Sequence, residues 1–264
     1  FYTALKRREE ITDLIFIQGL DLPLSGGNEL RRRSSQMAHE VAATLGKRLI
    51  EVKADTRCFS DRYVHYAYHY GSALAAIALL FQHRFRAVLV PAGQSYAHLH
   101  RDGSHPLLDP LWSTGRTQIV TDGAEARRTE KVESIASWEL AMRWLRVCLE
   151  NPDGVYNCGR CEKCLRTRIN LRAVGAEGRC RTLPRHLDLR QVRRLNFLEE
   201  RHRDYALDSL HAVEARGNDP KLARALRVAL GANLLRSALK TVAPAWARDA
   251  AQASRPRLRS RNEA

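Results

Sequence analysis

Four cysteines near the middle of the chain constrain its fold most. Cys148, Cys158, Cys161 and Cys164 stand in the pattern C-x9-C-x2-C-x2-C. Four thiolates this close in sequence can close a tetrahedral Zn²⁺ site, and a site with four protein ligands is structural rather than catalytic. An iron–sulfur cluster and a group of reduced thiols or a redox pair are the alternatives. The pattern therefore predicts a zinc knuckle that holds the fold together, with the chemistry elsewhere on the chain.

The length and composition indicate an intracellular globular protein. The 264 residues can bury a sizeable core, and six cysteines are too few for a small disulfide-dense secreted domain. No apolar run reaches the roughly 18 residues of a transmembrane helix, and no signal peptide is visible. We therefore expect a cytoplasmic protein without a membrane partner. The sequence leaves the oligomeric state open, and a homodimer is one alternative.

Positive charge is concentrated in the last third of the chain. Residues 1–164 contain 22 Lys and Arg against 19 Asp and Glu, whereas residues 165–264 contain 22 against 10. Such an excess is typical either of a surface that binds nucleic acid or another polyanion, or of solvated helix faces in an arginine-rich protein. The second interpretation is favoured, because aromatic–basic interleaving and base-reading motifs are absent from the sequence.

Short apolar segments alternate with helical patterns in the first 150 residues. Strands are predicted at 14–19, 48–53, 87–91 and 117–121, with helical spacing between most of them. Short strands isolated by helices are typical of α/β proteins with a doubly wound parallel sheet, which is the fold class expected here. In such sheets ligands bind beyond the carboxyl ends of the strands. The loops that follow the strands are therefore the candidate site.

Three regions are expected along the chain. Residues 1–180 form the α/β domain, which ends in the zinc knuckle at 148–164. A helical extension follows over 181–242. Residues 243–264 are rich in Pro, Arg and Ser and are predicted to be a disordered basic tail.

The string N-C-G-R-C-E-K-C-L-R, with Cys148 upstream, closely resembles the C-terminal zinc motif of 7-cyano-7-deazaguanine synthases, which are PP-loop ATP pyrophosphatases. The segment R-T-E-K-V-E-S-I-A resembles the Thr-Lys helix start that follows a strand in that family. The resemblance covers roughly residues 1–180. It implies an α/β domain that binds ATP, with Mg²⁺ on the phosphates and Zn²⁺ in a structural site.

The chain departs from that family in two respects. The signature S-G-G-x-D-S, whose backbone N–H groups cradle the ATP pyrophosphate, does not occur, and L-S-G-G-N-E at 24–29 lacks the Asp-Ser pair. We expect that the sequence begins just after this loop, because F-Y-T-A-L fits the helix that follows it. The segment 95–114 does not resemble the family's substrate region, so the acceptor stays open.

Residues near the carboxyl ends of the strands are candidates for nucleotide contacts. Asp21 could bind a ribose or an amine, and Arg57 could pair with a phosphate or carboxylate through its planar fork. The N-terminus of the helix that begins at Gly71 could bind an anion. The structural alternatives are a simple helix cap at Gly71 and a turn-forming role for Asp21. The candidates are Asp21, Arg57, Gly71, Ser72, Ser95 and Thr129.

Three further residues are candidates for the chemistry itself. Lys131 belongs to the Thr-Lys string and could neutralise phosphate. His105 and Asp109 lie in a Pro-containing loop and could position a substrate or act as acid and base, with loop hydrogen bonding as the alternative. His98 and His100 form an H-x-H pair that could bind metal, but a polar loop role is favoured for them.

The leading functional prediction is an ATP-dependent enzyme. By resemblance, it would adenylate a carbonyl or carboxylate oxygen of a small-molecule acceptor and release pyrophosphate. Ammonia or another nitrogen nucleophile would then displace AMP, because AMP makes the oxygen a good leaving group. Residues 1–264 alone are not expected to hydrolyse ATP without the phosphate loop. The alternatives are a zinc-stabilised nucleic-acid-binding module that uses the basic C-terminal third, and a partner protein that has lost catalysis.

Overall fold

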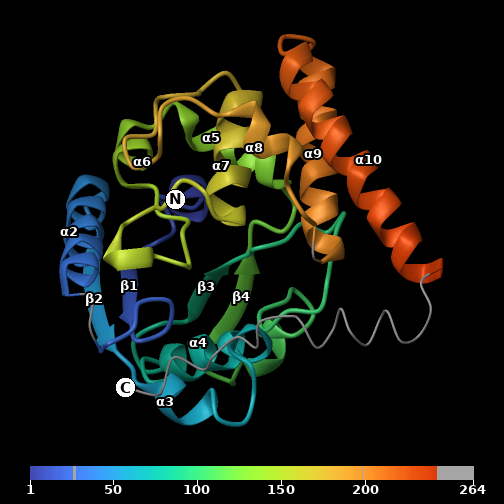
Figure 1. The fold of residues 1–264 in the computed structure, drawn as a ribbon. Coiled ribbons are helices and arrows are strands. Elements are labelled where there is room, and N and C mark those ends of the chain that lie inside the picture. Colours follow the sequence, from blue (N-terminus) through green and yellow to red (C-terminus); the bar gives the residue numbers. More distant parts are fainter. Residues whose placement is uncertain (26–27, 198, 243–264) are drawn as a thin grey trace.

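The structure is a computed structural model that describes residues 1–25, 28–197 and 199–242. It is a mixed arrangement of helices and short parallel strand pairs (Figure 1). The predicted tail at 243–264 and the glycine pair of the L-S-G-G-N-E string lie outside the described residues.

Four strands form two parallel pairs. They are β1 (Asp13–Gln18), β2 (Arg48–Lys53), β3 (Ala87–Pro91) and β4 (Gln118–Asp122). β1 pairs with β2, and β3 pairs with β4, each along its whole length. The predicted strands are confirmed to within one residue, because each is a short apolar run between helical or turn segments. Within the described residues the two pairs are separate sheets, so the single doubly wound sheet stays a prediction.

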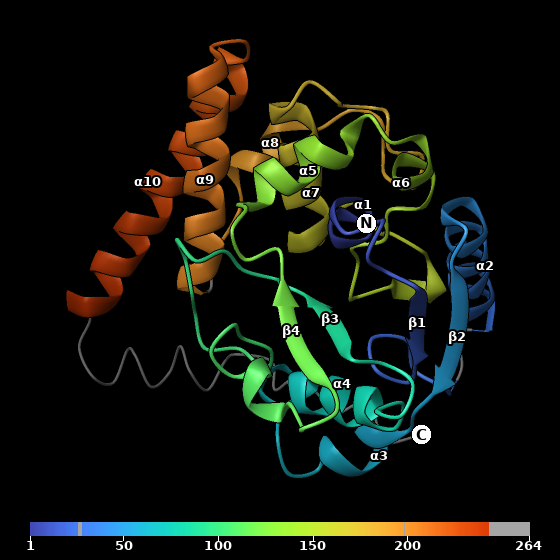
Figure 2. The same cartoon turned by 180° about the vertical axis from the view of Figure 1, so that it is seen from behind.

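Helices connect and cover the strands, as Figures 1 and 2 show from opposite sides. α2 (Asn28–Leu45) connects β1 to β2, and α4 (Tyr70–Leu79) precedes β3. The connection from β3 to β4 contains only the short 3₁₀ helix η2 (Asp109–Trp112). The other elements are α1 (Tyr2–Lys6), α3 (Thr56–Ser60), η1 (Tyr66–Tyr68), α5 (Arg128–Ala136), α6 (Glu139–Trp144), η3 (Pro152–Gly154), α7 (Glu162–Ala173), α8 (Leu189–Arg193), α9 (Glu200–Arg216) and α10 (Pro220–Val242).

α7 lies between two hydrophobic clusters. Cys164 and Leu171 pack into the cluster formed with α5 and α6. Leu165 and Ile169 pack into a second cluster, formed with α8, α9 and α10. Nine of the 12 residues of α7 are buried, among them two arginines, a threonine and an asparagine. A helix buried on all sides is usually apolar, so these polar residues need partners inside the protein.

The predicted helical extension corresponds to α8, α9 and α10. These helices pack against one another, and they share a hydrophobic cluster with α7. Among the described residues, none of the helices combines the length and the apolar character that crossing a bilayer requires.

A close backbone contact makes Gly71 necessary at the start of α4. A Cβ atom at this position would lie 2.0 Å from the carbonyl oxygen of Gly103. We therefore expect Gly71→Ala to lower the free energy of unfolding by about 1–3 kcal/mol through overpacking, measured by denaturant unfolding. Gly115→Ala is the matched control, because nothing lies within 4 Å of a Cβ there. Equal stability of the two variants would show that the contact does not constrain the fold.

Candidate functional site

The four cysteines converge at the N-terminus of α7. Their sulfur atoms all lie within 4.8 Å of one another. The Cys148–Cys161 and Cys158–Cys164 sulfur–sulfur distances are 3.9 and 4.0 Å. A regular tetrahedron with metal–sulfur bonds of about 2.3 Å has edges of about 3.8 Å. The four thiols could therefore hold a metal ion such as zinc without a large rearrangement.

Neighbouring groups favour the metal-binding form of the cysteines. The backbone N–H groups of Asn151 and Cys161 donate to the sulfur atoms of Cys148 and Cys158, each at 3.2 Å. Hydrogen bonding with Cys164 lowers the pKa of Cys161, which favours its thiolate form. The thiolate is the form that binds metal.

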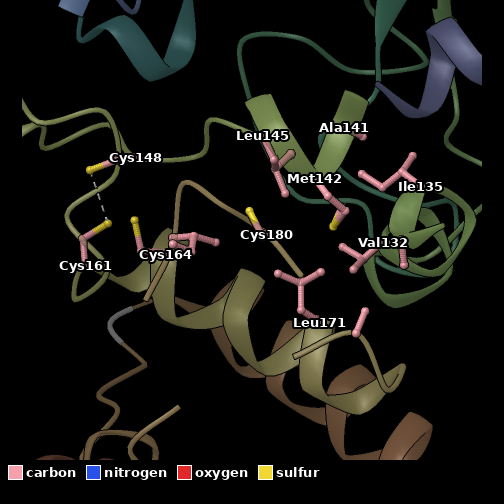
Figure 3. Close-up of a cluster of buried hydrophobic side chains, with 13 residues drawn as sticks. Val132, Ile135, Ala141, Met142, Leu145, Cys148, Cys161, Cys164, Leu171 and Cys180 are labelled. Carbon is pink, nitrogen blue, oxygen red and sulfur yellow. Dashed lines mark hydrogen bonds between the residues drawn. The ribbon is translucent and has the colours of Figure 1, made fainter. Parts of the chain in front are cut away.

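The cysteine group is continuous with the hydrophobic core. Figure 3 shows Cys148, Cys161 and Cys164 at one side of a buried cluster that also contains Leu145 and Leu171. Cys180 lies in the same cluster and is buried, but it does not belong to the group of four cysteines. A metal held by the four cysteines would thus join the loop after α6 to the core-forming face of α7.

A cavity of about 170 Å³ lies at the carboxyl ends of β3 and β4. Residues of α1, α5 and α7 complete its walls, and Arg128, Lys131 and Thr167 are among the polar lining residues. This is the position at which the parallel-strand pattern predicts a ligand. Of the residues predicted for the nucleotide or the chemistry, Lys131 is the one that lines this cavity.

Lys131 is held over the cavity by its surroundings. Its Nζ atom donates to the carbonyl oxygen of Ala92 at 3.0 Å and lies 5.9 Å from the centroid of the Tyr2 ring. Burial, and then the positive charge of Arg128, lower the pKa of Lys131 to about 8. The ammonium is thus mostly charged at neutral pH and can bind an anion.

Asp122 is a cavity residue that the sequence analysis missed. It ends β4, and its Oδ1 atom accepts from Lys6 at 2.9 Å and from Arg7 at 3.2 Å. Its Oδ2 atom is buried and has no hydrogen-bond partner among the described residues. The sequence did contain a signal for this residue, because an acidic residue at the end of a predicted strand, directly before Gly123, is typical of a ligand-binding position. The unpartnered oxygen could accept a hydrogen bond from a ligand or bind a cation.

Asp21 and Arg57 are brought together through Tyr66. The Tyr66 hydroxyl donates to Asp21 Oδ1 at 3.1 Å, and the Arg57 guanidinium carbon lies 4.4 Å from the centroid of the Tyr66 ring. Arg57 also pairs with Asp61 at 2.7 Å. These contacts bring together residues that follow β1 and β2, although none of these residues lines the cavity.

The other predicted nucleotide residues do not line the cavity either. Ser72 donates from Oγ to the carbonyl oxygen of His69 at 2.7 Å, and the Gly103 backbone covers Gly71. Ser95 and Thr129 are buried, Ser95 in the loop after β3 and Thr129 at the start of α5.

Asp109 organises its loop. Its carboxylate accepts from Ser104 Oγ at 2.7 Å, from the His105 backbone at 3.1 Å and from Thr121 Oγ1 at 2.7 Å. The His105 ring accepts from the Leu107 backbone at 3.1 Å. Both side chains therefore make the loop hydrogen bonds of the structural alternative, outside the cavity.

The H-x-H pair binds α9. His100 Nε2 lies 2.8 Å from Asp204 Oδ2, and His98 Nε2 lies 3.3 Å from Asp208 Oδ1. Arg127, directly before α5, lies 3.6 Å from the same oxygen of Asp208. The loop after β3 is thus attached to the helical extension. The two aspartates were missed, because nothing in the local sequence marks a helix residue as the partner of a distant loop.

The chain matches no protein-family model, and neither a curated protein nor a solved structure matches it. Its function therefore has to be argued from the geometry of these residues.

Replacing one cysteine of the group should release bound metal. We expect Cys161→Ser to lose the metal and to lower the free energy of unfolding by at least about 3 kcal/mol, a decrease in Tm of roughly 6–12 °C. Metal content is measured by mass spectrometry of the purified protein, and Tm by calorimetry. Cys58→Ser is the control, because Cys58 is exposed and remote from the group. An unchanged Tm for Cys161→Ser would contradict a stabilising metal.

Proposed function

We propose that the protein is an ATP-dependent enzyme of the PP-loop type that transfers AMP to a carbonyl or carboxylate oxygen of a small acceptor. The observation that carries the proposal is the cationic cavity at the carboxyl ends of the parallel strands β3 and β4. Its size suits part of a nucleotide. Its position next to the four-cysteine group follows the order of elements in the family that the sequence resembles.

The cavity offers the charges that a triphosphate needs. Lys131 and Arg128 lie on one side of α5, three residues apart, and both line the cavity. Fixed cations in a partly buried site stabilise the negative charge that develops on departing pyrophosphate. Asp122 supplies a carboxylate oxygen that is free for Mg²⁺, which would also be bound by the phosphates.

The proposed reaction has two steps. The acceptor oxygen attacks the α-phosphorus of ATP, the bond to the β-phosphate oxygen breaks, and pyrophosphate leaves with the electron pair. A nitrogen nucleophile then adds to the activated carbon, and AMP leaves with the former acceptor oxygen. Lys131 acts in the first step, by binding the phosphate oxygens. Candidates for the nitrogen source stay open.

The doubly wound sheet belongs to the same proposal. β1 and β3 each have one edge without a strand partner among the described residues. Figures 1 and 2 show the two strand pairs side by side, with α1 above them. One more parallel strand between these edges would join both pairs into a single sheet and satisfy the backbone groups of both edges.

We further propose that the four cysteines hold a structural Zn²⁺. The support is the sulfur–sulfur distance of about 4 Å, which matches a single ion bound by four thiolates. An iron–sulfur cluster would hold the sulfur atoms farther apart, because several irons lie between them. Four protein ligands leave no open position for a substrate, so this metal would stabilise the fold and take no part in the reaction.

Nucleic-acid binding by the basic extension is less favoured. Several of its arginines are paired with carboxylates: Arg201 with Glu199, Arg216 with Glu133 and Arg227 with Glu214. Paired arginines contribute less to binding a polyanion. The described part of the extension shows no specific feature that would select this function.

Nucleotide binding tests the proposal directly. We expect the complete gene product to bind ATP and to form pyrophosphate when an acceptor is present. Lys131→Met should weaken ATP binding by about tenfold or more, because a partly buried cation is lost. Isothermal titration calorimetry measures the affinity. Lys221→Met, on the exposed surface of α10, removes the same charge away from the cavity and should have no effect. Absence of ATP binding by the unaltered protein would refute the proposal.

The pKa of Lys131 gives a second test. Because its pKa is about 8, the ammonium that binds phosphate is present below pH 8 and is lost as the pH rises through that value. We expect ATP affinity to decrease between pH 7 and pH 9. Lys131→Arg stays charged throughout this range and should retain more of its affinity at pH 9 than the unaltered protein does. The same decrease in both proteins would assign the pH dependence to another group.

A further inference from the structure

α7 has two chemically different sides. Residues three or four positions apart share one side of a helix. Lys163, Arg166 and Thr167 therefore share one side, and Cys164 and Arg168 share a neighbouring one. Thr167 lines the cavity together with Arg128, whereas Lys163 and Arg166 do not line it.

Arg128 completes a group of three cations between α5 and α7. It lines the cavity, and its positive charge acts on both Lys163 and Arg166. Among the described residues, neither Arg128 nor Lys163 has a hydrogen-bond or ion-pair partner for its side chain. Arg166 is nine-tenths buried, and its guanidinium carbon lies 4.1 Å from the centroid of the Tyr205 ring.

The negative charges near this group do not balance it. Asp21 and Glu162 are the carboxylates that act on Lys163, and Glu162 pairs with Arg166 at a long distance of 3.4 Å. Asp21 is already bonded to the Tyr66 hydroxyl. The Nε atom of Arg166 is buried without an acceptor. Arg166 is buried, and Arg128 and Lys163 are partly buried. A partly buried group of like charges with unused donors is stabilised when an anion binds between them.

We propose that Arg128, Lys163 and Arg166 form a second anion-binding site, which binds a phosphate or carboxylate group of the acceptor. The assignment to the acceptor rests on the proposed function, whereas the anion site does not. Lys131, which also lines the cavity, remains available for ATP. The planar guanidinium groups can each bind two oxygens of such an anion, which would orient the acceptor beside the nucleotide.

The test uses inorganic phosphate and inorganic pyrophosphate as probes. Isothermal titration calorimetry of the complete protein should detect binding of at least one of them. Arg128→Gln and Lys163→Met should each weaken that binding about tenfold or more, which corresponds to about 1.4 kcal/mol. Arg193→Gln, an exposed arginine of α8, is the matched control and should bind as the unaltered protein does.

A stability measurement separates binding from folding. Lys163 is adjacent to Cys164, so its variant is used only if metal content and Tm are retained. Arg128 lies on α5, away from the cysteines in sequence. If the Lys163 variant does not fold, the Arg128 variant alone tests the proposal. Absence of phosphate and pyrophosphate binding, or unchanged binding by Arg128→Gln, would overturn the anion site.

A titration in the presence of saturating ATP identifies the ligand. If phosphate binds equally well with ATP present, the site serves the acceptor, as proposed. If ATP displaces phosphate, the site binds the phosphates of the nucleotide, and the assignment to the acceptor is wrong. A protein that binds phosphate but never ATP would refute the proposed function and leave the anion site intact, so the two failures are distinguishable.

Discussion

The convergence of four thiols at the start of α7 is the contact on which most of the architecture depends. α7 separates the two main hydrophobic clusters and is buried on nearly all sides, although a third of its residues are buried polar groups. Hydrophobic burial alone would not select this position for so polar a helix. A metal held by the cysteines would tie its first turn to the loop after α6, and the position of that turn determines where Lys163, Arg166 and Thr167 lie.

Charge explains how this helix tolerates its polar residues. A divalent ion bound by four thiolates carries a net charge of minus two. Arg146 and Arg168 lie near the cysteines, and Arg168 also donates to the carbonyl oxygen of Gly159 at 2.9 Å. If the four cysteines hold such an ion, Arg146 and Arg168 have it as their counter-charge. Arg128 and Lys163 have no ion-pair partner among the described residues, which distinguishes a structural arginine from a cation that can bind a ligand.

Local features were predictable from the sequence, and long-range contacts were not. The strands agree to within one residue, and the cysteine group was predicted from spacing alone, because both signals are local. Lys131 was found as part of a short string. Asp122 had a local signal at the end of a strand, whereas the roles of the aspartates of α9 depend on tertiary contacts. Asp109 was predicted as a candidate for the chemistry, but a polar residue in a loop can equally well organise that loop. Its three hydrogen bonds within the protein show the second role. How the two strand pairs relate is likewise a question that no local pattern answers.

The attachment of α9 to the loop after β3 has a consequence for cooperativity. Asp208 is almost completely buried and lies near His98 and Arg127, so pulling α9 away would leave three charged or polar groups without partners at once. The extension and the cavity wall should therefore open together or not at all. A protease that cuts between α7 and α9 would then report on the integrity of the cavity, although its cleavage site lies outside it.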